Sequence, residues 1–137
     1  MEVYTLKKDI HVYCITASSF PDGIKPAFDK LHEIAPIAEN RTYYGISSPE
    51  RGKIKYRAAA NEIYDGELNA RGMQAHVIKK GKYLLIEIKD FMNNLPGIEK
   101  AFKQLTNDKR IDPHGECVEW YKDNKTCRCM VRMKTAL

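Results

Sequence analysis

The sequence has no apolar run near the roughly 20 residues that a membrane-spanning helix requires, so we expect no membrane partner. Residues 1–14 contain no long apolar segment followed by a small-residue cleavage site. This absence argues against a secretory signal and predicts a cytoplasmic protein.

Signatures of nucleic-acid binding are also missing. The net charge is +5, from 23 Lys and Arg against 18 Asp and Glu. The basic residues are spread along the chain as singles or pairs, such as Lys7-Lys8, Lys79-Lys80 and Lys109-Arg110. There is no basic arm, helix-turn-helix pattern, ribonucleoprotein aromatic motif or zinc-finger spacing. We therefore predict no direct nucleic-acid binding and interpret the excess of lysine as a solvated surface.

Metal and cofactor motifs are absent as well. The four cysteines are Cys14, Cys117, Cys127 and Cys129, and they include no C-x-x-C pair and no structural zinc spacing. We expect reduced, packed thiols, as is usual in cytoplasmic proteins, and no metal site. No serine-nucleophile motif or phosphate-binding loop occurs. The sequence thus predicts no cofactor and favours a binding protein over an enzyme.

What the chain does contain is a repeat within a single domain. With 137 residues, of which 43% are apolar, one core spanning residues 1–137 is expected. Residues 23–31 and 97–105 both read G-I-x-x-A-F-x-x-L, at a constant offset of 74. Apolar residues at i, i+3, i+4 and i+7 are typical of one helix face, so two equivalent amphipathic helices are predicted.

The flanks of the two helices repeat as well. Alternating strand-like runs precede them near residues 10–15 and 84–89, and two further runs follow each, at 42–47 and 53–59 and at 116–122 and 126–134. The pseudo-repeats cover about 8–60 and 82–134, joined by residues 61–81. We predict an α+β fold: a duplicated strand-helix-strand-strand unit forming an antiparallel sheet, with two main helices on one face and a concave ligand groove.

Strand alternation predicts which side chains share a face of this sheet. The residues expected under the helices are Ile10, Val12, Cys14, Leu84, Ile86 and Ile88, and those expected on the uncovered face are His11, Tyr13, Tyr83 and Glu87. Near the carboxyl terminus, Glu119 and Tyr121 share one face and Trp120 takes the other, where it is expected to belong to the core. We place the function in a concave pocket between the two halves, a common position for ligand sites.

The chain resembles the GyrI-like small-molecule-binding domain over roughly residues 8 to 134. The residues that carry this likeness are Tyr44-Gly45-Ile46, Lys55-Tyr56-Arg57-Ala58-Ala59-Ala60, Gly72-Met73, Ile78-Lys79-Lys80-Gly81-Lys82-Tyr83, the helix at 97–105 and Cys117-Val118-Glu119-Trp120-Tyr121. The family includes effector-binding domains of bacterial multidrug-sensing transcription activators and stand-alone DNA gyrase inhibitory proteins. No DNA-binding domain precedes this one, so a stand-alone domain is expected.

The resemblance implies a pocket for hydrophobic, often aromatic and cationic molecules, with a buried glutamate that corresponds to Glu119. A carboxylate among aromatic rings attracts an organic cation by its charge, and the ring faces add cation–π contacts. The candidate walls of this pocket are Tyr56, Tyr83, Tyr13, Tyr121 and the deformable Met130. The small-molecule ligand is the expected partner, and its identity and the oligomeric state are not predicted.

Several alternatives stay open at this point. Glu119 can instead form a cross-strand ion pair with Arg128 or Arg132, and the tyrosines can be ordinary half-buried strand residues. The offset of 74 aligns Tyr56 with Met130 but leaves the register of that strand undetermined. Some relatives hydrolyse cyclopropane-bearing alkylating compounds, which makes Glu119 a candidate general base. A third hypothesis is a partner-binding protein, such as a gyrase modulator, that uses its basic surface.

Overall fold

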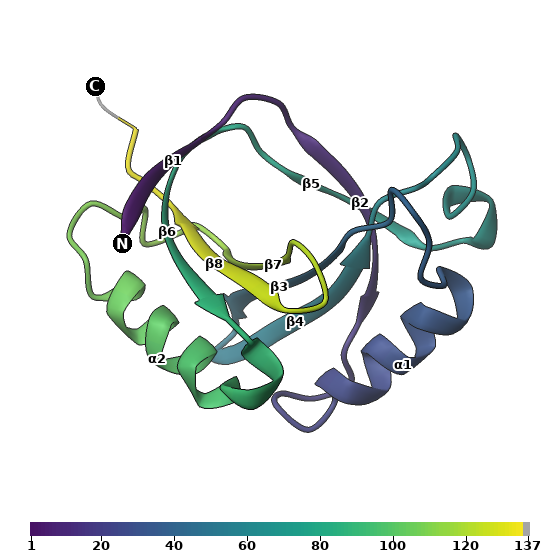
Figure 1. Cartoon of the computed structure of the whole chain (residues 1–137), viewed down its shortest axis with the longest axis horizontal. Helices are drawn as coiled ribbons and strands as arrows, with labels where there is room; N and C mark the ends of the chain where they lie inside the picture. Colours follow the sequence, from purple (N-terminus) through teal and green to yellow (C-terminus); the bar gives the residue numbers. More distant parts are fainter. Residues whose placement is uncertain (136–137) are drawn as a thin grey trace.

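The computed structural model describes residues 1–135 and has an α+β fold, with an antiparallel eight-stranded sheet and two main helices. The strands are β1 (Glu2–Leu6), β2 (Ile10–Thr16), β3 (Tyr43–Glu50), β4 (Lys53–Ala60), β5 (Gln74–Ile78), β6 (Gly81–Lys89), β7 (Cys117–Tyr121) and β8 (Thr126–Arg132). The helices are α1 (Ile24–Ile34) and α2 (Leu95–Thr106), with short 3₁₀ turns η1 (Asn69–Arg71) and η2 (Phe91–Asn93). The sheet curls strongly, and both helices lie outside the curl (Figure 1).

The repeated motif forms the two helices, as predicted. Its alanine and leucine are the buried residues of each helix, Ala27 and Leu31 in α1 and Ala101 and Leu105 in α2. Proline in the first turn of α2 removes no intrahelical hydrogen bond, because the first amide groups of a helix have no partner there. The helices therefore bind the sheet through the same two motif positions.

The strand pairs predicted after each helix are present as β3–β4 and β7–β8. Arg51 and Gly52, at the tip between β3 and β4, both have positive φ (53° and 78°), which suits a tight two-residue hairpin turn. Two strands were not predicted, β1 and β5. Both are short, at five residues each, and their apolar alternation is weak.

The strand order is β1-β6-β8-β7-β3-β4-β2-β5, which places β1 and β2 toward opposite ends of the sheet, and likewise β5 and β6. The pairing of β1 with β6 ends at the residue pair Leu6 and Gly81, and the pairing of β2 with β5 begins at the residue pair Ile10 and Ile78. The links between these pairs, residues 7–9 and 79–80, lie side by side, and the Lys80 amide donates to Asp9 Oδ1 at 2.8 Å. The first and last strands of the sheet are thus tied together, and this closes the curl (Figure 1).

The inside of the curl is packed with side chains. The buried members of this inner cluster are Leu6, Val12, Cys14, Tyr44, Ile46, Ala59, Ile78, Tyr83, Leu85, Val118 and Met130. Trp120 packs against the cluster, as expected for a core residue. The concave face of the sheet is therefore a hydrophobic core along these strands.

The prediction of which residues lie under the helices is right for one strand and wrong for the other. Leu84, Ile86 and Ile88 pack under α2, as expected. Ile10, Val12 and Cys14 do not pack under α1: they point into the curl, while Tyr13 and Ile15 pack against the α1 cluster. The helices repeat at an offset of 74, but β2 and β6 face opposite ways at that offset. Because side chains alternate with period two, a one-residue difference in the strand reverses its faces.

All four cysteines are free thiols. Cys127 and Cys129 are fully buried on the side of β8 that faces α2, so the two side chains point the same way as their spacing predicts. Desolvation raises the pKa of the Cys14 thiol to about 12. A protonated thiol is a poor nucleophile, so Cys14 is a packing residue.

Candidate functional site

A cavity lies between the two helices, on the outer side of the curled sheet. Helix α1 packs mainly on β2 and β4, and α2 mainly on β6 and β8, so the central pair β3–β7 lies between them. The cavity has a volume of about 560 Å³ and draws on both helices, on η2 and on the ends of β3 and β7. Its aromatic and large apolar lining residues are Ile24, Phe28, Ile37, Tyr43, Phe91, Met92, Leu95 and Tyr121.

Glu119 lies next to this cavity and accepts hydrogen bonds from two tyrosines. The Tyr56 hydroxyl donates to Oε1 at 2.7 Å, and the Tyr121 hydroxyl donates to the same oxygen at 2.5 Å. Within residues 1–135, no side chain donates to Oε2. Tyr121 also lines the cavity, so the carboxylate is one side chain removed from it. This arrangement leaves one carboxylate oxygen available to a further donor.

Gly45 makes room for this arrangement. It pairs directly with Glu119 across β3 and β7. A Cβ atom at this position would overlap the Tyr56 hydroxyl and lie only 2.5 Å from Glu119 Oε1. The missing side chain of Gly45 is therefore what allows the tyrosine from β4 to reach the glutamate on β7 across the strand between them.

The carboxylate of Glu119 has no cationic partner in the described part of the chain. Arg128 pairs with Glu87 at 3.1 Å, and the Arg132 guanidinium donates to backbone carbonyls, so the alternative of a cross-strand ion pair with Glu119 is wrong. Burial raises the pKa of Glu119, and the hydrogen bonds from Tyr121 and Tyr56 oppose that shift. Burial and the nearby carboxylate raise the pKa of both tyrosines, which keeps them neutral donors.

Aromatic rings cover the glutamate on the helix side. Phe28 of α1 contacts Tyr121 edge-on, with ring centroids 5.9 Å apart and planes at 87°, and contacts Tyr56 at 6.2 Å and 63°. Phe91 of η2 lies 5.2 Å from the ring of Tyr121. Phe28 thus lines the cavity and contacts both hydrogen-bond donors of the carboxylate, so with Tyr121 it forms the part of the wall nearest Glu119.

The rim of the cavity combines exposed apolar side chains with the polar residues Lys122, Asp123 and Asn124, and the buried cation Arg41 is neutralised. Ile37 is 82% exposed, Met92 67% and Leu95 54%. The Arg41 side chain is 1% exposed and forms a bidentate ion pair with Glu67, at 2.8 and 2.6 Å. This pair fixes the connector between β4 and β5 to the cavity wall and leaves Arg41 without a free charge to offer Glu119.

The structure brings together three of the six predicted ligand-binding residues. Glu119, Tyr56 and Tyr121 form the hydrogen-bonded group just described. Tyr13 packs against the α1 cluster instead. Tyr83 and Met130 are buried in the inner cluster, on the opposite face of the sheet from the carboxylate.

Sequence reasoning missed the helix residues that face the glutamate. Phe28 is the phenylalanine of the repeated G-I-x-x-A-F-x-x-L motif, which was interpreted only as a core position. His32 lines the cavity as well, with its ring 4.7 Å from that of Tyr43. Gly45 lies 74 residues before Glu119, so the repeat itself pointed to this pair.

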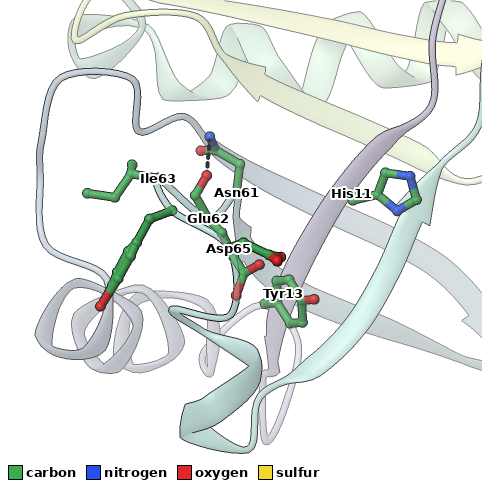
Figure 2. A pocket seen from close by; sticks show the side chains of 7 residues that line it. His11, Tyr13, Asn61, Glu62, Ile63 and Asp65 are labelled. Carbon is green, nitrogen blue, oxygen red and sulfur yellow. Dashed lines mark hydrogen bonds between the residues drawn. The ribbon is translucent and has the colours of Figure 1, made fainter.

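A second, shallower pocket of about 490 Å³ lies beside the connector. Its lining is His11, Tyr13, Asn61, Glu62, Ile63, Tyr64 and Asp65, and Figure 2 shows these side chains around an open, polar depression. The Glu62 carboxylate accepts hydrogen bonds from the backbone amides of Gly66, Leu68 and Asn69, which lowers the pKa of Glu62. Glu62 therefore stabilises a turn.

Two further features bear on function. In the described residues, no three or more His, Cys, Asp or Glu side chains come together in a way that would hold a metal ion. Neither main helix in residues 1–135 is long and apolar enough to cross a membrane.

The chain matches no protein-family model and no curated protein sequence. Among solved structures, it is similar to an integron cassette protein from the mobile metagenome of Vibrio cholerae, with a TM-score of 0.72 and 11% sequence identity. The superposition covers 97% of this chain and 95% of that protein. At this identity, the similarity establishes the fold alone.

Proposed function

We propose that this protein binds hydrophobic organic cations in the cavity between α1 and α2, with Glu119 as the counter-charge. The observation that carries this proposal is a half-buried carboxylate that is held only by tyrosine hydroxyls, beside an aromatic-lined cavity. Removing a carboxylate from water without a cation is costly. A cationic ligand supplies the missing positive charge and gains cation–π contacts of about 0.5 to 2 kcal/mol with the rings.

The same arrangement favours cations over neutral molecules of equal shape. The cavity offers apolar area to both, but only a cation gains from the Glu119 charge in surroundings where water screens it weakly. Phe28 lines the cavity and contacts both tyrosines that donate to the carboxylate, so its ring would contact a ligand bound beside Glu119. The GyrI-like resemblance supports this choice of ligand class, with the site between the helices rather than on the concave face.

The strand order supports the proposed duplication. The segments β2-α1-β3-β4 and β6-α2-β7-β8 have the same element order and take mirrored places on either side of the β3–β7 pair. Strands β1 and β5 precede the two segments, and each pairs with the first strand of the other. In this interpretation, Gly45 and Glu119 are equivalent positions of the two repeats. The glycine at position 45 leaves the space that the Glu119 carboxylate and its tyrosine partner occupy.

The test is a thermal-shift screen with flat aromatic cations and their neutral analogues. A ligand at about 100 times its Kd stabilises the folded state by about 2.7 kcal/mol, which raises the Tm by several degrees. We expect cation-selective shifts in the wild type that disappear in Glu119→Gln. The matched control is Glu99→Gln, which removes a carboxylate that is 76% exposed on α2 and should leave the shifts unchanged.

Equal shifts with neutral analogues, or cation shifts that survive Glu119→Gln, would refute the counter-charge. Hydrolysis is a second candidate, favoured by the fixed position of Oε1 between two hydroxyls and by the unoccupied Oε2, which suits a general base. Mass spectrometry of the same incubations distinguishes the two candidates. Binding returns the cation intact, whereas hydrolysis consumes it in the wild type but not in Glu119→Gln.

A further inference from the structure

The two links that close the curl of the sheet bring together lysines from distant parts of the sequence. Residues 7–9 and 79–80 lie side by side, and Lys82 follows directly on β6. The lysine patch consists of Lys7, Lys8, Lys79, Lys80 and Lys82, all of which are exposed. With about 3.3 Å per residue and about 4.8 Å between strands, the five Cα atoms lie within roughly 10 Å along the ribbon.

No carboxylate in residues 1–135 forms an ion pair with these five lysines. Asp9, the acidic residue between them, accepts its hydrogen bond from the Lys80 backbone amide. Arg132 lies beneath the patch, where its guanidinium donates to the carbonyls of Lys79 and Lys80, at 3.3 and 2.9 Å. The charges of the patch therefore face solvent without internal compensation.

The patch carries a charge as large as the net charge of the protein. Its five lysines, with Arg132 and Asp9, carry a net +5, which equals the net charge of the whole chain. The patch is thus a concentrated positive surface, although its members are far apart in the sequence. It lies at the top of Figure 1, on the side of the curl away from both helices and their cavity.

We propose that the lysine patch is a docking surface for an acidic segment of another protein. Its charges are flexible ammonium groups within a short span, and these match a few carboxylates of an extended chain, whose same-side residues repeat about every 7 Å. Nucleic acid fits less well. Readout of a duplex groove uses an inserted helix or β-ribbon, and single strands stack on exposed aromatic rings. The patch lies on two short links and the start of β6 rather than on a helix, and its neighbour Tyr83 is buried.

The test uses a fluorescently labelled all-glutamate peptide as the probe, with its all-glutamine analogue as a control, and measures binding by fluorescence anisotropy. We expect saturable binding of the glutamate peptide alone. It should weaken as the Debye length shortens from about 30 Å at 0.01 M salt to about 8 Å at 0.15 M. Charge reversal in Lys7→Glu/Lys80→Glu should weaken it at least about tenfold, because like charges in contact cost several kcal/mol.

The matched control is Lys30→Glu/Lys100→Glu, which makes the same change in net charge at exposed positions of α1 and α2. It should alter the affinity by less than about twofold, given that screening limits distant charges. Equal weakening by both double variants would overturn the proposal, because net charge alone would then explain binding. Tighter, patch-dependent binding of an oligonucleotide would also overturn it in favour of nucleic acid.

The patch and the cavity are tested independently. Glu119→Gln should leave binding of the glutamate peptide unchanged, and Lys7→Glu/Lys80→Glu should leave the cation shifts unchanged. A loss of peptide binding in Glu119→Gln would show that the two surfaces are coupled and would contradict docking at the lysine patch alone. Thermal unfolding of each variant verifies that it is folded before its binding is compared.

Discussion

Two glutamates three residues apart face opposite sides of the sheet, and their surroundings differ in kind. Glu116 points into the curl, where its carboxylate lies 2.8 Å from His76 Nε2 and 3.5 Å from Arg57 Nη1. Glu119 points toward the helices, where its partners are two neutral hydroxyls. One carboxylate is matched by basic side chains of the chain itself, and the other is not.

Under the proposed function, the difference separates a structural charge from a ligand-binding one. His76 belongs to β5, at one end of the strand order, and Glu116 precedes β7 near its middle, so their contact crosses the interior of the curl. Such a contact holds the shape of the sheet. Glu119 gains nothing comparable from the chain, since hydroxyl donors only partly offset the loss of water. A binding site is where such an unmatched charge is useful.

The largest effect is expected from Gly45→Ala, which disturbs only the Glu119 side of this comparison. The added methyl group overlaps the Tyr56 hydroxyl, and overpacking of this kind costs about 2–3 kcal/mol. Urea unfolding measures the loss. Ser48→Ala, three residues along the same strand and partly exposed, should change stability by less than about 0.5 kcal/mol. Adding Tyr56→Phe to Gly45→Ala should recover part of the loss, and no recovery would show that the strain lies elsewhere.

A smaller loss of stability is expected from Glu116→Gln, which removes the carboxylate charge that faces Arg57 and His76. Arg57 is 14% exposed in its side chain, and its Nη1 atom is buried without a hydrogen bond, so the nearby negative charge is its main compensation. Removing that charge should cost about 1–2 kcal/mol of unfolding free energy. Glu119→Gln should cost less than half as much at neutral pH, because a glutamine still accepts the tyrosine hydrogen bonds. If urea unfolding showed a larger loss for Glu119→Gln than for Glu116→Gln, Glu119 would be the charge that stabilises the fold and Glu116 the one that does not.

The sequence predicted both main helices and six of the eight strands of residues 1–135 because their periodicities are strong, and it missed β1 and β5, whose alternation is weak. The motif at 23–31 and 97–105 predicted both helices and the residues that bind the sheet. The spacing of Glu119 and Tyr121 placed them on one face, since side chains of a strand alternate. The prediction of which β2 side chains face α1 was wrong. A shift of one residue between β2 and its repeat β6 exchanges the two faces of the strand, and the apolar pattern of β2 does not indicate that shift.

The candidate site depends on contacts that periodicity does not encode. Tyr56 reaches Glu119 only because β3 lies between their strands and has a glycine at position 45. Phe28 reaches both tyrosines because α1 packs on β4 and β2, beside the strands that carry them. The packed interior follows from the closure at residues 7–9 and 79–80, and this closure also gathers lysines that are more than 70 positions apart in the sequence. These are consequences of pairing over long distances in the chain.

The smallest expected effect is a pH dependence that belongs to Glu119. Its pKa is raised in the folded state, so the folded protein binds the proton more tightly than the unfolded chain does. Stability from this group is therefore full below the ordinary glutamate pKa and is lost as the pH rises through the raised value. The slope cannot exceed about 1.4 kcal/mol per pH unit for one proton. Urea unfolding of wild type and Glu119→Gln at acid and at neutral pH isolates the contribution of Glu119, because the other groups titrate equally in both proteins. The free energy of unfolding of Glu119→Gln should rise relative to that of the wild type as the pH rises. A difference that does not change with pH would mean that the carboxylate is as well solvated in the folded state as in the unfolded chain.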